Sequence, residues 1–115
     1  MRKRNAPGVI VNTASVAAFS PMPADPAYSA SKAGIVNFTQ SCKPLHEAFD
    51  IRVMAVCPGV TDTAIVPRDA EWLQPALAAL KMLTPDDIAA AVKGIVEDDT
   101  QSGDYVAVNN APVDA

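Results

Sequence analysis

The chain has 115 residues, half of them hydrophobic, and a formal net charge of −4. This length allows one small domain at most. The negative charge argues against a nucleic-acid groove, and no stretch approaches the ~20 apolar residues of a membrane span. Cys42 and Cys57 lie among apolar residues without metal-like spacing. We therefore expect reduced thiols, no metal site and a cytoplasmic protein.

The first half of the chain predicts a strand, a loop and a helix. Residues 8–14, GVIVNTA, form a β-branched run that is apolar on both faces, which is typical of a strand in a covered parallel sheet. Residues 17–26 contain three prolines, so we expect a loop. Residues 27–49 have the pattern of one long helix. Pro44 lies inside that helix and should end or kink it near Lys43.

The second half continues the alternation. Residues 51–57 predict another buried strand, and residues 69–83 a helix interrupted by a proline. Residues 84–98 predict a helix that Thr84 caps, and residues 102–110 a third strand. Strands that alternate with helices imply right-handed crossovers. The expected fold class is α/β, with a partial doubly wound parallel sheet of Rossmann-like type: three strands with their helices.

The segment DPAYSASKAG, residues 25–34, places Tyr28 and Lys32 four residues apart on one helix face. A tyrosine hydroxyl ordinarily has a pKa near 10 and is a poor acid or base at neutral pH. A nearby ammonium group stabilises the phenolate and makes such a pair a usable general acid/base. Taken alone, however, the pair fits an ordinary helix surface better, because this spacing is common.

Two neighbouring features favour chemistry. Ser15 lies at the end of the first predicted strand, thirteen residues before Tyr28, and the second predicted strand ends in the turn CPGVTDT. Open parallel sheets bind their ligands at the carboxyl ends of the strands. A serine hydroxyl there can hydrogen-bond an oxygen whose charge changes. Three such features on consecutive elements favour a catalytic site over coincidence.

The segments VNTAS (11–15), YSASK (28–32) and PGVTDT (58–63) together resemble the second half of the short-chain dehydrogenase/reductase family. Within that family, YSASKAGIVNFTQS and IVEDDTQSGDYVAV look closest to the 15-hydroxyprostaglandin dehydrogenase-like branch. The resemblance implies an NAD(P)-dependent oxidoreductase. Such an enzyme interconverts a secondary alcohol and a ketone by hydride transfer.

The resemblance also implies a role for each site residue. Tyr28 would be the catalytic acid/base, and Ser15 would hold the substrate oxygen. Lys32 would stabilise the phenolate and bind the nicotinamide ribose. Four further residues would line the nicotinamide, the last of them near its carboxamide: Pro58, Gly59, Val60 and Thr63. The cofactor would be NAD or NADP, and the resemblance favours NAD slightly.

One part of the family pattern is missing. The family begins with a strand and a Gly-rich turn whose helix N-terminus cradles the cofactor pyrophosphate, and the five glycines of this chain cannot form that turn. We therefore expect residues 1–115 to be the C-terminal part of a single Rossmann-like domain that lacks its N-terminal cofactor half. The strand at 8–14 would then present an open apolar edge. Residues 64–83 would be the substrate lid, in which Trp72 either packs on the lid itself or lines the pocket.

Three interpretations of the function of this chain remain open. The first is the dehydrogenase, with a small-molecule alcohol or ketone as substrate and no nucleic-acid or membrane partner. The resemblance also implies a homo-oligomer in which the helix that carries Tyr28 packs against its copy, and Ala30, Ala33 and Gly34 are small enough for that approach. The second is a truncated, inactive fragment that acts as a structural or dimerisation module, or has no function. The third is an unrelated α/β binding domain in which the Tyr28–Lys32 pair is incidental.

Overall fold

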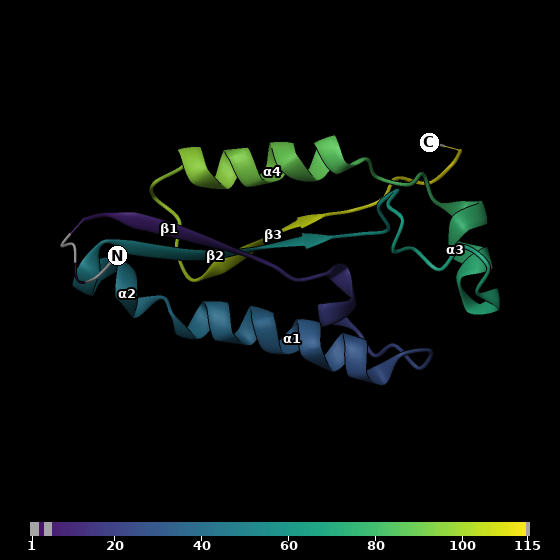
Figure 1. Cartoon of the computed structure of the whole chain (residues 1–115), viewed down its shortest axis with the longest axis horizontal. Helices are drawn as coiled ribbons and strands as arrows, with labels where there is room; N and C mark the ends of the chain where they lie inside the picture. Colours follow the sequence, from purple (N-terminus) through teal and green to yellow (C-terminus); the bar gives the residue numbers. More distant parts are fainter. Residues whose placement is uncertain (1–2, 4–5, 115) are drawn as a thin grey trace.

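The computed structural model describes residue 3 and residues 6–114, in which three parallel strands form one sheet (Figure 1). The strands are β1 (Gly8–Thr13), β2 (Ile51–Pro58) and β3 (Asp104–Val108), and β2 lies in the middle. Six residue pairs join β1 to β2 and five join β2 to β3. The predicted α/β class and the parallel three-stranded sheet are thereby confirmed.

Helices cover both faces of the sheet, α1 (Pro26–Ser41) on one side and α4 (Pro85–Glu97) on the other (Figure 1). Alternate residues of β2 point to opposite faces. Ala55 and Cys57 pack with Val36 of α1, whereas Met54 and Val56 pack with Ile95 of α4. The continuous apolar run in β2 is therefore explained by burial on both faces.

The helix expected at 27–49 is in fact two helices, α1 and α2 (Pro44–Phe49). The Cys42 amide donates to the carbonyls of Phe38 and Thr39 at 3.1 Å, which closes α1. Pro44 then occupies the first turn of α2, where its missing N–H costs nothing. The expected break near Lys43 is confirmed, and a single continuous helix is wrong.

The segment between β2 and α4 differs most from expectation. Residues 71–73 form the 3-10 helix η3 (Glu71–Leu73), and α3 (Gln74–Ala79) follows directly, with Pro75 in its first turn. Residues 80–83 are extended and bridge to Pro112 and Thr61, so the helix expected to reach residue 83 ends at Ala79. A second 3-10 helix, η2 (Val16–Phe19), lies in the region predicted as a loop.

The start of α4 agrees with the sequence prediction. The Thr84 hydroxyl accepts from the Asp87 amide at 3.2 Å, and the Asp87 carboxylate accepts from the Thr84 amide at 2.8 Å. These reciprocal bonds form a capping box. No helix in the described residues has the length and apolar character needed to cross a membrane.

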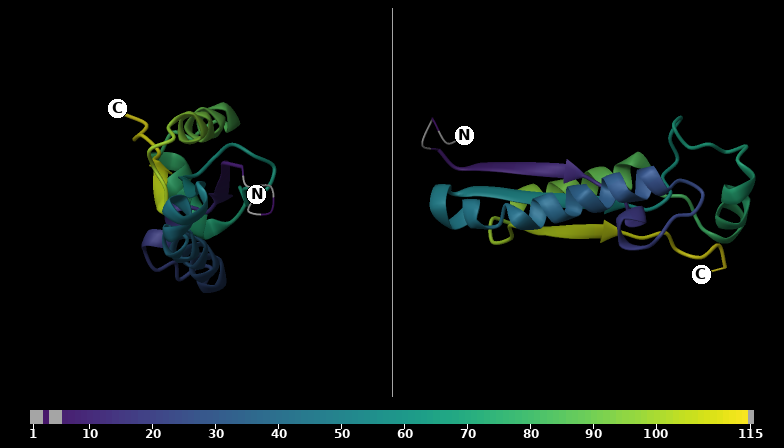
Figure 2. Two further views of the ribbon diagram at one scale, coloured as in Figure 1. Left: turned by 90° about the vertical axis from the view of Figure 1, so that its left-hand side faces the viewer. Right: turned by 90° about the horizontal axis from the view of Figure 1, so that it is seen from below.

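The molecule is elongated, with extents of 49 × 27 × 23 Å and a radius of gyration of 15.9 Å. A compact chain of about this size has a radius near ~13 Å. Within the described residues β1 pairs only with β2, so its outer edge is open (Figure 2). Ile10 on this strand is 41% exposed. The expected open apolar edge is confirmed.

This edge predicts self-association. Ile10→Lys is expected to shift the 115-residue chain toward monomer, because a charged side chain on an edge strand opposes pairing with another chain. Sedimentation velocity at micromolar concentration measures the effect. The matched control is Ile65→Lys, which makes the same change at a residue that is 89% exposed and lies between β2 and α4. Equal mass distributions for the two variants would contradict the prediction.

Candidate active site

Ser15 lies just beyond the end of β1 and is buried. Its hydroxyl oxygen accepts from the Ala17 amide at 3.1 Å and caps η2. The Ala14 amide donates to the Val56 carbonyl at 2.8 Å, and the Ser15 backbone hydrogen-bonds the Cys57 thiol. Burial nevertheless raises the pKa of Cys57, because desolvation outweighs that hydrogen bond. Ser15 is thus fixed beside the end of β2.

Tyr28 lies in the first turn of α1, and its main chain is held in place by Asp25. The Asp25 carboxylate caps the helix by accepting from the Tyr28 amide at 3.1 Å. The buried Ser29 hydroxyl reaches the Ala17 carbonyl at 2.8 Å and the Ser20 carbonyl at 3.0 Å. These bonds hold the start of α1 against η2, and therefore close to Ser15, which caps η2.

Lys32 lies one turn further along α1. Its Nζ atom is 5.6 Å from the centroid of the Tyr28 ring and makes a long contact of 3.5 Å to the Thr13 carbonyl oxygen at the end of β1. Tyr28 is 40% exposed, which leaves it accessible to a ligand. The three predicted catalytic residues therefore gather at one end of the sheet. No hydrogen bond between the Ser15 and Tyr28 hydroxyls is present in the described part of the chain.

The predicted nicotinamide-lining turn follows β2 at the same end. The Gly59 amide donates to the Val108 carbonyl at 2.8 Å, which continues the pairing with β3. The Val60 amide donates to the side chain of Asn110 at 2.8 Å. Thr63 lies further along, half-buried in the next turn. Sequence reasoning missed Asn110, because no local pattern marks a residue whose partner is fifty positions away.

The site fits the nicotinamide end of a dinucleotide better than its phosphates. An ammonium and a phenol at a sheet edge can hold ribose hydroxyls. A pyrophosphate, by contrast, needs free N–H groups at a helix N-terminus. In α1 and α4 that position is capped by the chain itself, by Asp25 in α1 and by the Thr84–Asp87 capping box in α4. Among residue 3 and residues 6–114, no cluster of His, Cys, Asp or Glu side chains could hold a metal ion.

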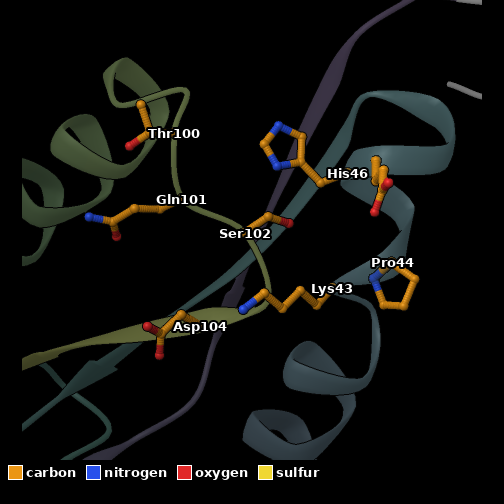
Figure 3. Close-up of a pocket in the computed structure, with 8 residues that line it drawn as sticks. Lys43, Pro44, His46, Thr100, Gln101, Ser102 and Asp104 are labelled. Atoms are coloured by element: carbon orange, nitrogen blue, oxygen red, sulfur yellow. The ribbon is translucent and has the colours of Figure 1, made fainter.

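A separate hollow of about 680 Å³ lies at the opposite end of the sheet, between α2 and the loop before β3. Lys43 and His46 border it on one side, and Gln101 and Asp104 on the other (Figure 3). The His46 Nε2 atom is 3.9 Å from an Asp50 carboxylate oxygen. This hollow is distant from the strand ends that carry the candidate site.

Fold and site together define an α/β protein with a Rossmann-like parallel sheet and a Ser–Tyr–Lys set at its carboxyl edge. The sequence model for short chain dehydrogenases matches residues 1–74. The chain belongs to the short chain dehydrogenase family.

Individual relatives support this membership. The human 3-hydroxyacyl-CoA dehydrogenase type-2 is 35% identical over 109 residues, which cover 90% of this chain and 42% of that protein. The 15-hydroxyprostaglandin dehydrogenase of Bos taurus is 30% identical over 118 residues, which cover 90% and 44%. The crystal structure of 3-hydroxyacyl-CoA dehydrogenase type-2 from Mycobacterium avium superimposes with a TM-score of 0.77 at 27% identity, covering 91% of this chain and 42% of that one. The chain thus spans less than half the length of these relatives.

Proposed function

We propose that this chain carries the proton-transfer part of an NAD(P)-dependent dehydrogenase site that interconverts a secondary alcohol and a ketone. One observation carries the proposal. The Lys32 ammonium group lies near the Tyr28 ring and 3.5 Å from the Thr13 carbonyl oxygen, at the end of the strand that leads to Ser15. A cation in that place can stabilise a phenolate where an open parallel sheet binds its ligand.

Each of the three side chains has a distinct part in the proposed reaction. Because the Ser15 oxygen accepts from the Ala17 amide, its own proton is available to donate to a substrate oxygen. Tyr28 takes the alcohol proton in oxidation and returns it in reduction. Lys32 stabilises the charge that Tyr28 then carries. These roles follow the family pattern residue by residue.

The same proposal assigns the cofactor contacts. When bound, a nicotinamide would supply the hydride acceptor for oxidation of the alcohol and the hydride donor for reduction of the ketone. Tyr28 and Lys32 would hold the adjoining ribose. The ring and its carboxamide would lie against a second group of residues: Pro58, Gly59, Val60 and Thr63. The bovine prostaglandin-metabolising relative is named as an NAD(+) enzyme, which favours NAD over NADP.

The cofactor phosphates require a further element. We propose that residues 1–115 act as the C-terminal part of one Rossmann-like domain, with the Gly-rich phosphate cradle supplied by additional polypeptide. Residues 64–83 would then form the substrate lid. Within this lid Leu73 is buried, whereas Trp72 is 48% exposed and Ile65 is more exposed still. Trp72 and Ile65 are thus available to contact an apolar substrate.

A structural or dimerisation module is the second candidate. Ala30, Gly34 and Phe38 follow one another at four-residue spacing along α1. Phe38 is 63% exposed, and a Cβ added to Gly34 would meet nothing within 4 Å. Small residues beside an exposed aromatic ring favour packing against a second copy of the helix. A homo-oligomer is compatible with either candidate, and the free cysteines fit a cytoplasmic location.

Cofactor binding separates the two candidates. NADH fluorescence titrations of the chain, alone and mixed with a Gly-rich N-terminal half taken from a family member, should show saturable binding that is tighter in the mixture. Lys32→Met should weaken it by about tenfold, because a charge-assisted hydrogen bond is lost. Lys93→Met is the matched control, since Lys93 lies on α4 with its partner Glu97. Absence of saturable binding in both preparations would leave only the structural module.

A further inference from the structure

Asn110 lies two residues beyond β3, where three segments of the chain meet. Its Oδ1 atom accepts from the Val60 amide at 2.8 Å. Its Nδ2 atom donates to the carbonyls of Val60 and Lys81, each at 2.8 Å. The acceptor and both donor hydrogens of one half-buried amide are therefore used within the protein.

The same side chain explains a glycine in the neighbouring turn. A Cβ added to Gly59 would overlap Oδ1 of Asn110. The φ angle of Gly59 is outside the left-handed region, so a side chain is excluded here by space and not by backbone conformation. The turn and the amide thus fit each other as a pair.

The C-terminal end of the proposed lid, residues 80–83, is hydrogen-bonded to the turn after β2 and to the chain next to Asn110. We call this segment the base of the lid. The Leu83 amide donates to the Val60 carbonyl at 2.9 Å, and the Lys81 amide donates to the Ala111 carbonyl at 2.8 Å. The returning lid segment, residues 80–83, therefore runs between the turn after β2 and the chain beyond β3. Asn110 bonds both to that turn and to the returning segment.

We propose that Asn110 is a positioning residue that couples the Pro58–Val60 turn to the base of the 64–83 lid. It binds both the N–H and the C=O of Val60, and it holds the Lys81 carbonyl in register with them. This inference rests on the proposed cofactor site in one respect: a ligand that orders the turn should also order the lid base.

Amide hydrogen exchange of the full chain tests the coupling directly. In Asn110→Ala, exchange at the Val60 and Leu83 amides should rise by about tenfold. Amides of Val53 and Val56 in the sheet core should be unchanged. Asn109→Ala removes the adjacent, exposed amide side chain and is the matched control, for which no change is expected. Unchanged exchange at Val60 and Leu83 in Asn110→Ala would overturn the proposal.

Two further variants keep the test decisive if Asn110→Ala unfolds. Asn110→Asp retains the acceptor for the Val60 amide but loses both donors, so Leu83 should be deprotected more than Val60. Gly59→Ala displaces the same Asn110 side chain that Asn110→Asp alters. The effect of the double variant on exchange at Leu83, expressed as a free energy, should therefore differ from the sum of the two single effects. Strict additivity would show that the turn and the amide act independently, and would overturn the proposal.

NADH supplies a readout that a purely structural role would not move. In the wild-type chain, NADH should slow exchange in residues 81–83, and in Asn110→Ala this effect should be lost while exchange in the turn still responds. Lid protection that persists in Asn110→Ala would overturn the coupling. If NADH binds neither the wild-type chain nor its mixture with the Gly-rich N-terminal half, the proposed function fails, and the exchange comparison without ligand still decides the role of Asn110.

Discussion

Tyr28→Phe is expected to lower cofactor-dependent turnover of a secondary alcohol by about 10²–10⁴-fold, the range that one positioned acid/base contributes. The variant removes only the hydroxyl that would exchange the substrate proton. The free energy of unfolding should change little, because Tyr28 is 40% exposed and its main-chain bond to Asp25 is kept. Turnover is measured as absorbance of reduced nicotinamide with a panel of secondary alcohols. The sample is the chain together with the N-terminal half that completes the cofactor site.

Tyr105 offers a control with the identical chemical change. It lies on β3, is 38% exposed, and packs against Phe19 in a tilted arrangement with ring centroids 4.6 Å apart. Tyr105→Phe keeps the ring and should retain turnover. Comparable losses in the two variants would indicate a general effect of losing a tyrosine hydroxyl. Retention of more than a small fraction of turnover in Tyr28→Phe would refute the acid/base role.

Much of the fold could be predicted because its strongest signals are local. The β-branched runs marked β1 and β2, and Thr84 with Pro85 marked the start of α4. The candidate catalytic residues were found in the same way, since Tyr28 and Lys32 lie on one helix face. Their assembly at one sheet edge also followed, because parallel strands place their carboxyl ends together.

The features that sequence reasoning missed depend on residues far apart in the chain. Asn110 bonds the turn at Val60, and no local pattern announces such a pairing. Arg52 lies in a run that predicts an apolar strand, yet it is buried and hydrogen-bonded to residues more than forty positions away. The two helices within 27–49 have a different explanation. A proline is compatible both with a kink inside one helix and with the first turn of a new helix, so Pro44 alone does not decide between them.

Arg52→Met is expected to destabilise the chain by about 3 kcal/mol, the largest stability effect we predict. The buried guanidinium group donates to the carbonyls of Ile95, Val96 and Asp98 at 3.0, 2.9 and 2.8 Å. It thereby satisfies the free carbonyls at the end of α4 and lies where the helix dipole favours a cation. Methionine keeps the apolar stem but leaves these carbonyls, of which that of Ile95 is buried, without their charged donor. Urea denaturation measures the change.

Arg68→Met is the matched control, because Arg68 is exposed and its guanidinium contacts Asp62 and the Met82 sulfur at the surface. Its loss should cost at most about 1 kcal/mol. Equal losses in the two variants would show that the bonds of Arg52 contribute no more than a surface pair.

The region of Arg52→Met that loses exchange protection is a second criterion. Arg52 also donates to the Gln101 carbonyl in the loop before β3 at 3.4 Å, so the last turn of α4 and β3 should lose exchange protection before α1 does. Because β3 leads to Asn110, Arg52→Met should also loosen the Val60 turn, although Arg52 lies at the opposite end of the sheet.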